Sequence, residues 1–260
     1  MFAALTAAGA FAQLEAPNPA GVRLGHIHLA VKDVAEQERF WVDMMGGTVV
    51  KNGPLSLIQL PGVYIMLRKA EPSEPPAGSI VDHFGFVFQD LPGMLAKWKA
   101  AGLKVDQTVN PNQGYVNAPD GVRVEFFGKP SITAPVMMDH IHFYAKDASG
   151  MQKFYADVFG LAAGRRPQVA IPGWIDCVYL PGGSNLSFSP FDTVLAPTKG
   201  RSLDHIGFDV VDLDIFAARL EKMGLHFDAP PRPIASSKTR VAFLTDPWGT
   251  YIEVTEKLAP

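Results

Sequence analysis

The sequence predicts an α+β protein of four β-α-β-β-β modules that pair into two incomplete barrels. The first observation is a segment that occurs four times, each copy with a His at its second place and alternating apolar residues. The copies are GHIHLAVKD at Gly25–Asp33, DHFGFVFQD at Asp82–Asp90, DHIHFYAKD at Asp139–Asp147 and DHIGFDVVD at Asp204–Asp212. A two-residue alternation of this kind is typical of a β-strand with one buried face. The chain is therefore organised by internal repetition.

The second observation is that a helical segment follows each repeated strand and ends at a Gly, the residue that most often closes a helix. The predicted helices are Val34–Met45, Leu91–Ala101, Ala148–Phe159 and Leu213–Met223. Three short strand-like segments then complete each unit, separated by Gly, Pro and Asn. In the last unit they are His226–Asp228, Arg240–Thr245 and Thr250–Glu256. One such unit leaves an apolar sheet face open, so a second unit must cover it.

Domain boundaries follow from composition. The Pro-containing connector Gly128–Pro135 divides the four units into two halves. We expect a first domain over residues 21–130 and a second over 136–260, each closing its own barrel from two units. Residues 1–20 are set apart, because Phe2–Ala12 (FAALTAAGAFA) resembles the apolar region and cleavage site of a signal peptide. An exported or periplasmic protein is expected if this is a truncated signal, and a cytoplasmic one otherwise.

Composition narrows the classes of partner. With 47% hydrophobic and 19% charged residues the chain is globular, and its net charge of -3 offers no basic stripe for nucleic acid. No apolar run reaches the roughly 20 residues that span a membrane. A single Cys, Cys177, excludes an internal disulfide and a thiolate-rich zinc site. The expected partner is a small-molecule substrate, and a homodimer is possible because such barrels can be completed by exchange between chains.

Histidine is concentrated in the repeated strands, which hold six of the seven in the chain. Two of the six, His28 and His142, stand two residues after the first His of their copies and so share its strand face. The matching places in the other two copies are Gly85 and Gly207. We expect these glycines to leave room for the additional imidazole opposite them.

A carboxylate recurs on the last strand of the second and fourth units: Glu125 in PDGVRVEFF and Glu253 in PWGTYIEVT. A solvent-facing Glu on an antiparallel strand would show the same local pattern. Its recurrence at one place in the repeat instead favours a metal site, in which two His from paired first strands and one Glu form a 2-His-1-carboxylate face. Such a face leaves coordination positions open for a substrate. The donors suit Fe(II), Mn(II), Zn or Ni(II).

The four units, the DHI-type first strands and the DPxGxxxE-like ending resemble the vicinal oxygen chelate superfamily over Gly21–Lys257. This superfamily includes glyoxalase I, extradiol dioxygenases, methylmalonyl-CoA epimerase and the fosfomycin- and bleomycin-resistance proteins. The resemblance implies a divalent metal held by first-strand His and last-strand Glu residues. It places His26, His83 and Glu125 in one half and His140, His205 and Glu253 in the other.

Departures from the family patterns bear on the reaction. Glyoxalase I resembles this layout but also uses a last-strand carboxylate from the odd-numbered unit, and those places hold Met66 and Ser187. Extradiol dioxygenases match the segment DPWGTYIE that contains Glu253, but their upstream His is missing and Phe243 stands where they have Tyr. His142, and likewise His28, is therefore a candidate catalytic residue that replaces the missing acid-base group.

Three functional interpretations follow. In the first, the protein is a metal-dependent enzyme acting on a small oxygenated substrate, aromatic substrates included. Within it the missing second carboxylate favours a dioxygenase with Fe(II) or Mn(II) over a glyoxalase-like lyase or isomerase. In the second, the protein is a metal-free ligand-binding protein like those of bleomycin resistance. In the third, it is a non-catalytic partner module. Two complete His-His-Glu sets favour the first interpretation.

Overall fold

The computed structural model describes residues 14–168 and 172–259. The predicted signal-like segment Phe2–Ala12 lies outside these residues. Within them, no helix combines the length and the apolar character needed to cross a membrane.

The first two units each hold four strands and one main helix, as the repeats predict. The first contains β1 (Val22–Val31), α1 (Val34–Arg39), the π-helical η1 (Phe40–Met44), β2 (Thr48–Asn52), β3 (Leu55–Leu60) and β4 (Val63–Lys69). The second contains β5 (Val81–Phe88), α2 (Leu91–Ala100), β6 (Val105–Gln107), β7 (Gln113–Asn117), the 3₁₀ turn η2 (Pro119–Gly121) and β8 (Arg123–Gly128).

The last two units repeat the pattern. The third contains β9 (Val136–Ala145), α3 (Ala148–Phe159), β10 (Ala162–Pro167), β11 (Trp174–Tyr179), the 3₁₀ turn η3 (Pro181–Gly183) and β12 (Asn185–Pro190). The fourth contains β13 (Leu203–Val210), α4 (Leu213–Lys222), β14 (Ala229–Pro233), β15 (Arg240–Thr245) and β16 (Tyr251–Glu256). The predicted helices are thus confirmed, and Asp33, Asp90, Asp147 and Asp212 accept hydrogen bonds from backbone N–H groups in the first turns.

One predicted strand lies at the wrong residues. The prediction put the first short strand of the last unit at His226–Asp228, whereas β14 begins at Ala229 and contains three prolines. Proline lacks the N–H group that a central strand needs, so the sequence of this segment is typical of a loop. β14 lies at the edge of its sheet, and its register with β15 is irregular between Ala229 and Arg232, so proline is tolerated there.

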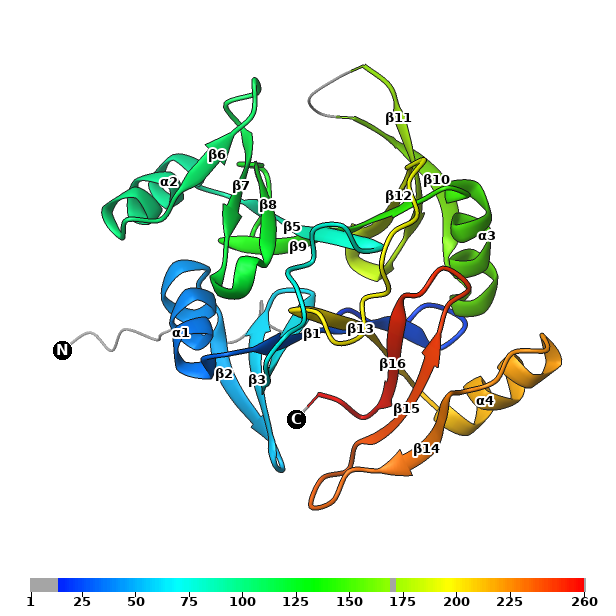
Figure 1. Cartoon of the computed structure of the whole chain (residues 1–260). Coiled ribbons are helices and arrows are strands. Elements are labelled where there is room, and N and C mark those ends of the chain that lie inside the picture. Colours follow the sequence, from blue (N-terminus) through cyan, green and yellow to red (C-terminus); the bar gives the residue numbers. More distant parts are fainter. Residues whose placement is uncertain (1–13, 169–171, 260) are drawn as a thin grey trace.

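The pairing of the units differs from the expectation of one barrel per half, which is wrong. The first unit pairs with the fourth in an eight-stranded sheet of order β14-β15-β16-β13-β1-β4-β3-β2. The second pairs with the third in the order β10-β11-β12-β9-β5-β8-β7-β6. Figure 1 shows the two sheets crossing the molecule one above the other. Both are completed within one chain, because the short link between β8 and β9 brings the second and third units together and leaves the first to the fourth.

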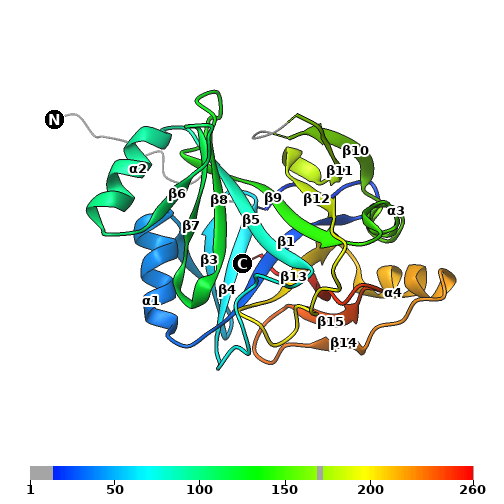
Figure 2. The ribbon, with the colours of Figure 1, turned by 45° about the horizontal axis from the view of Figure 1, so that its top comes forward.

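The two units of each sequence half lie in different sheets and meet through aromatic packing between them. Trp41 of η1 is fully buried and stacks on Phe84 of β5 with ring centroids 5.7 Å apart. On the other side, Phe159 of α3 stacks on Phe208 of β13 at 4.0 Å. Figure 2 shows α1 beside α2 and α3 near α4. One continuous apolar core therefore lies between the sheets and joins all four units.

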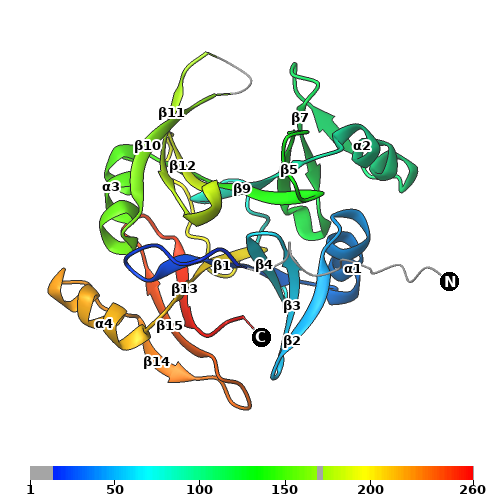
Figure 3. The ribbon, with the colours of Figure 1, turned by 180° about the vertical axis from the view of Figure 1, so that it is seen from behind.

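Strand alternation separates this core from the faces that carry the histidines. In β5, Phe84 and Phe86 point into the core, so His83 and Gly85 point to the opposite face of the sheet. The same alternation places the His residues of β1, β9 and β13 on the faces that turn away from the core. Figure 3 shows the sheets from behind, with β1 and β13 together at the middle of one sheet.

Candidate metal centres

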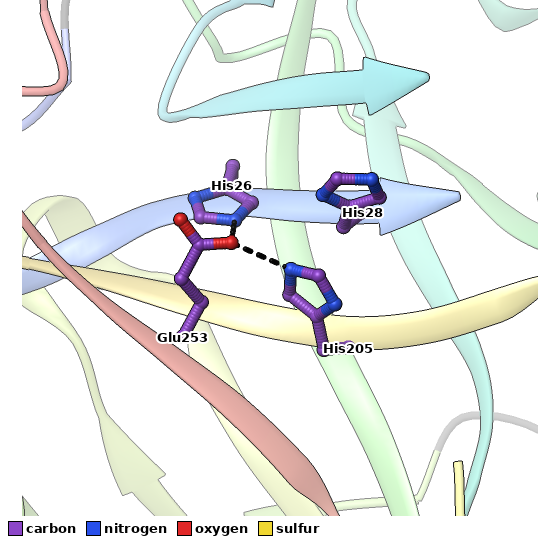
Figure 4. Close-up of side chains that lie close together, drawn as sticks. All are labelled: His26, His28, His205 and Glu253. Atoms are coloured by element: carbon purple, nitrogen blue, oxygen red, sulfur yellow. Dashed lines mark hydrogen bonds and ion pairs between the residues drawn. The ribbon is translucent and has the colours of Figure 1, made fainter. Parts of the chain in front are cut away.

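The central strand pair of the first sheet forms a cluster that we call the first site: His26, His28, His205 and Glu253. β1 and β13 run antiparallel, with His28 opposite His205 and His26 opposite Gly207. β16 lies parallel to β13 and places Glu253 beside Gly207. Glu253 Oε2 lies 2.8 Å from His205 Nε2 and 3.4 Å from His26 Nε2 (Figure 4). All four side chains offer donor atoms within 4.8 Å of one another.

The second sheet builds a matching cluster, the second site: His83, His140, His142 and Glu125. β5 and β9 run antiparallel, with His83 opposite His142 and Gly85 opposite His140. Glu125 Oε2 lies 3.1 Å from both His83 Nε2 and His140 Nε2. The donor atoms of the three His residues lie within 4.8 Å of one another.

The grouping of the candidate ligands therefore needs correction. The expected set of His26 with His83 and Glu125 does not form, nor does His140 with His205 and Glu253, because neither set shares a sheet. Each site combines a first-strand His of an odd unit with the His and Glu of its even partner. All six residues expected as ligands are nevertheless brought into one or other of the two clusters.

Gly85 and Gly207 make room for a different imidazole from the one that we expected. A Cβ on Gly85 would lie 2.5 Å from Cε1 of His140, and one on Gly207 would lie 2.0 Å from Cε1 of His26. The glycines thus make room for the first His of each odd unit. The additional residues, His28 and His142, face the imidazoles of His205 and His83 instead, with ring centroids 4.3 and 4.8 Å apart.

Carboxylates orient three of the imidazoles from behind. Nδ1 of His83, His140 and His205 lies 2.6, 2.8 and 2.6 Å from the carboxylate of the preceding residue, Asp82, Asp139 and Asp204 respectively. This contact fixes the ring and directs Nε2 toward the site, an arrangement common behind metal-binding His. The sequence signal was the Asp-His pair in three of the four repeats. Gly25 replaces the Asp before His26.

A further polar residue that sequence reasoning missed belongs to the second site. Gln113 Nε2 donates a 2.6 Å hydrogen bond to Glu125 Oε1 and holds the carboxylate in place. Gln113 lies on β7, twelve residues before Glu125, and nothing in its local sequence sets it apart. The neighbouring-strand register alone brings the two side chains together.

The charges in the clusters are strongly coupled. Burial by itself raises the pKa of Glu125, but the neighbouring imidazoles of His140 and His83 outweigh it and hold the pKa well below its usual range. Burial also raises the pKa of Glu253, and His26 and His205 more than reverse it. Burial lowers the pKa of His140, yet the carboxylates of Asp139 and Glu125 raise it overall. Each Glu is therefore ionised, as a metal ligand must be.

The second His of each odd unit behaves differently. Burial, followed by the nearby charge of His205, lowers the pKa of His28 well below its usual value. Burial and the charge of His83 do the same for His142. Both imidazoles are therefore neutral near pH 7, with one donor and one acceptor nitrogen each. His142 Nε2 lies 2.9 Å from Ser189 Oγ.

Buried imidazole nitrogens without a hydrogen-bond partner show whether a metal ion fits the two sites. Among the described residues, both ring nitrogens of His26 and His28 and Nε2 of His140 are buried without a hydrogen-bond partner. His140 Nε2 lies close to Glu125 Oε2 but is not aligned for a hydrogen bond with it. A buried polar atom left unpaired costs about 1–3 kcal/mol, so these nitrogens need a partner. A divalent cation at each point of convergence supplies one, and the donor sets fit it.

A cavity of about 200 Å³ opens onto the second site and is lined by His83, Glu125 and His142. Around them stand the polar side chains Gln113, Tyr115, Tyr144, Arg166 and Ser189. Arg165 points outward to Asp176, whereas Arg166, the next residue on β10, turns to the cavity and donates from Nε to Ser187 Oγ at 2.7 Å. The cavity therefore combines possible metal ligands, hydrogen-bonding groups and one cation.

The positions of the missing second carboxylates are confirmed by the strand register. Met66 lies beside His28, and Ser187 lies beside His142. These places are equivalent to those of Glu253 and Glu125, which lie beside Gly207 and Gly85. Each site thus holds one Glu, and a second imidazole stands next to the place where the other Glu would be.

The fold and the two clusters define a glyoxalase-type protein with tandem units. The sequence profile of the Glyoxalase/Bleomycin resistance protein/Dioxygenase superfamily matches residues 23–126 and 137–254, and the chain belongs to this family. A search of curated proteins found no match.

Solved structures show the same fold at low sequence identity. Glyoxalase I from Zea mays is 16% identical with a TM-score of 0.72, and the alignment covers 90% of this chain and 92% of that one. A putative dioxygenase from Bacillus subtilis subsp. subtilis str. 168 is 12% identical with a TM-score of 0.67, over 94% of this chain and 86% of the other. Both likenesses span the four units.

Proposed function

We propose that the protein is a divalent-metal-dependent enzyme whose active centre is the second site, with His83, His140 and Glu125 as metal ligands. The observation that carries this proposal is that Glu125 Oε2 lies 3.1 Å from Nε2 of each His, and that His83 and Glu125 line a polar cavity. Three protein ligands leave positions free for a substrate, as in catalytic metal sites. The substrate is a small oxygenated molecule that fits the cavity.

The donor set favours Fe(II) or Mn(II) and also accommodates Zn or Ni. A bound ion would supply Lewis-acid chemistry and hold a chelating substrate in place. The chain's own residues prepare this position: Asp82 and Asp139 orient the two imidazoles, and Gln113 fixes the carboxylate. The orientation of every ligand is thus set by a second side chain.

Acid-base chemistry in the cavity falls to His142. Its ring lines the cavity and stacks on Tyr144 with centroids 4.9 Å apart, while Nε2 meets Ser189 Oγ. An imidazole held in this way accepts a proton from a substrate or returns one to it. Arg166 adds a positive charge to the same cavity and favours a substrate with an anionic oxygen.

The absent second carboxylate favours oxygenase-type chemistry over a glyoxalase-like reaction. The place of that carboxylate is held by Ser187, whose hydroxyl contacts Arg166 Nε and Asn185 Oδ1 and is no base at neutral pH. A glyoxalase-like lyase or isomerase would have to use His142 as its base. A protein that binds its ligand without metal would leave Nε2 of His140 unpaired, which argues against that alternative.

The test begins with elemental analysis of protein purified without chelators. A divalent metal should be present, and His83→Ala and Glu125→Gln should lose the ion of the second site. Oxygen uptake with catechols, compared with isomerisation of a glutathione hemithioacetal, then separates the two chemistries. His142→Ala should lower kcat while the ion stays bound. Protein without metal before and after loading would contradict the proposal.

A further inference from the structure

The two sites offer different numbers of ligands. At the first site, Glu253 and the three imidazoles of His26, His28 and His205 all lie within 4.8 Å of one another. At the second site the corresponding group contains the three imidazoles without Glu125. The first site therefore brings four protein donors to one place.

His28 and His142 occupy equivalent positions but have different neighbours. His142 is tied by Nε2 to Ser189 Oγ at 2.9 Å. Both ring nitrogens of His28 are buried and, among the described residues, without any hydrogen-bond partner. A neutral imidazole carries one donor and one acceptor, so an unpaired ring of this kind needs a ligand. A cation beside Glu253 satisfies its acceptor nitrogen.

The walls around the two sites also differ in polarity. At equivalent positions of the strand register, Val241 replaces Gln113 and Phe243 replaces Tyr115. In the same way, Met66 and Tyr64 of β4 stand where the second site has Ser187 and Asn185. At three of these four positions the first site has an apolar side chain where the second has a hydrogen-bonding one, and Tyr64 alone carries a polar group. The first site thus keeps its possible ligands but offers fewer groups that would orient a substrate.

Two chain segments cover the apolar wall of the first site. Leu14 and Leu258 pack into one cluster with Leu57, Tyr64 and Met66. The backbone N–H of Leu258 donates to Asp209 Oδ1 at 3.1 Å, and Asn52 Nδ2 donates to the Leu258 carbonyl at 2.7 Å. This segment therefore runs from β16 to the β2-β3 hairpin and ties the fourth unit to the first, as Figure 3 shows.

We propose that the first site is a closed structural metal site in which His26, His28, His205 and Glu253 all serve as ligands. This inference rests on the proposed metal chemistry of the family fold and assigns a different task to each half. Structural zinc sites use four protein ligands, whereas catalytic zinc sites use three and keep the fourth position for water or substrate. The ion of the first site holds the first and fourth units together, and turnover belongs to the second site.

The experiment uses Zn(II) as the probe on the full chain. The protein is loaded with Zn(II), excess ion is removed, and release to a chelator is followed with a colorimetric indicator. Two ions per chain should leave in two phases, the fast phase from the second site and the slow phase from the first. His28→Ala should lose the slow phase, bind one ion fewer and melt at a lower temperature. The matched variant His142→Ala should still bind two ions.

A second variant decides the matter if His28→Ala does not fold. His83→Ala should lose only the fast phase and keep the slowly released ion. If the slow phase instead disappears in His83→Ala and persists in His28→Ala, the structural site is disproved while the proposed active centre stands. If the wild-type protein binds only one ion and His83→Ala still binds it, the active centre fails and the structural site stands. Wild-type protein that binds no ion overturns both.

Discussion

At the scale of single residues, the two sites depend on two missing side chains. Gly85 and Gly207 lie opposite His140 and His26, and the imidazoles occupy the space that a Cβ would fill. No real Cβ approaches a ring carbon to 2.5 Å, so the contact can be relieved only by moving the ring or the strand. Glycine is therefore required at these positions by a close approach, not by its backbone conformation.

This geometry makes a site-specific prediction. Gly85→Ala should displace His140 and abolish metal binding at the second site, while the ion of the first site remains. Gly207→Ala is the matched variant and should displace His26 with the opposite result. Metal stoichiometry with release kinetics measures both. Equal affinity at both sites in either variant would show that the rings are not ligands.

Gln113 supports a second prediction. Gln113→Leu removes the 2.6 Å hydrogen bond to Glu125 Oε1 at a buried position. Loss of such a supporting contact typically weakens metal binding about 10- to 100-fold, and titration of the apoprotein with Mn(II) should show this loss at the second site only. Gln107→Leu, on the neighbouring exposed strand, is the control and should leave the affinity unchanged. Wild-type affinity in Gln113→Leu would remove the supporting role.

At the scale of elements, each repeat carries its own start signal for a helix. Asp147 precedes α3 and accepts a 2.8 Å hydrogen bond from the backbone N–H of Gly150. α3 packs against the third unit's strands and, through Phe159, against β13 of the other sheet. The cap is thus local, but the helix that it begins is part of the contact between the sheets.

We expect Asp147→Ala to lower the free energy of unfolding by about 1 kcal/mol. The backbone N–H of Gly150, in the first turn of α3, loses its acceptor in this variant. Denaturation with urea measures the change. Asp147→Asn keeps an oxygen acceptor and should retain most of the stability. If the two variants are equally destabilised, the charge of Asp147, not its hydrogen bond, is responsible.

At the scale of the whole molecule, strand pairing and sequence halves do not coincide. β1 pairs with β13 and β5 with β9, so each sheet draws one unit from each half. The halves are joined within themselves chiefly by aromatic packing, such as Trp41 on Phe84. Either half alone would expose two central strand edges, β1 and β5 or β9 and β13, and unpaired edges of this kind associate or stay unfolded.

A prediction about fragments follows. The chain segment 21–130 produced alone should be unfolded or self-associated, and it should not form a monomeric metal site. Produced together with 136–260, it should yield a complex that binds metal as the full chain does. Size-exclusion chromatography with metal analysis distinguishes these cases. A folded monomeric half that binds a metal through His26, His83 and Glu125 would contradict the observed pairing.

The sequence by itself determined the four units, their helices, and the six His and Glu residues expected as ligands. Alternation and the closing Gly of each helix are local patterns, and the repeat is found by comparing one short segment with its copies. The position of β14 could not be predicted, because three prolines are typical of a loop unless the segment is known to lie at the edge of a sheet. The role of Gln113 was lost because it depends on a neighbouring strand.

Only the tertiary structure decided which His meets which Glu. Four similar units allow several pairings, and the repeats that make each unit recognisable also make their edges look alike. The choice depends on long-range contacts, on the short link between β8 and β9, and on the aromatic core between the sheets. The same contacts set the two sites apart, one beside a polar cavity and the other beneath Leu14 and Leu258. No local pattern records a difference that arises where distant segments meet.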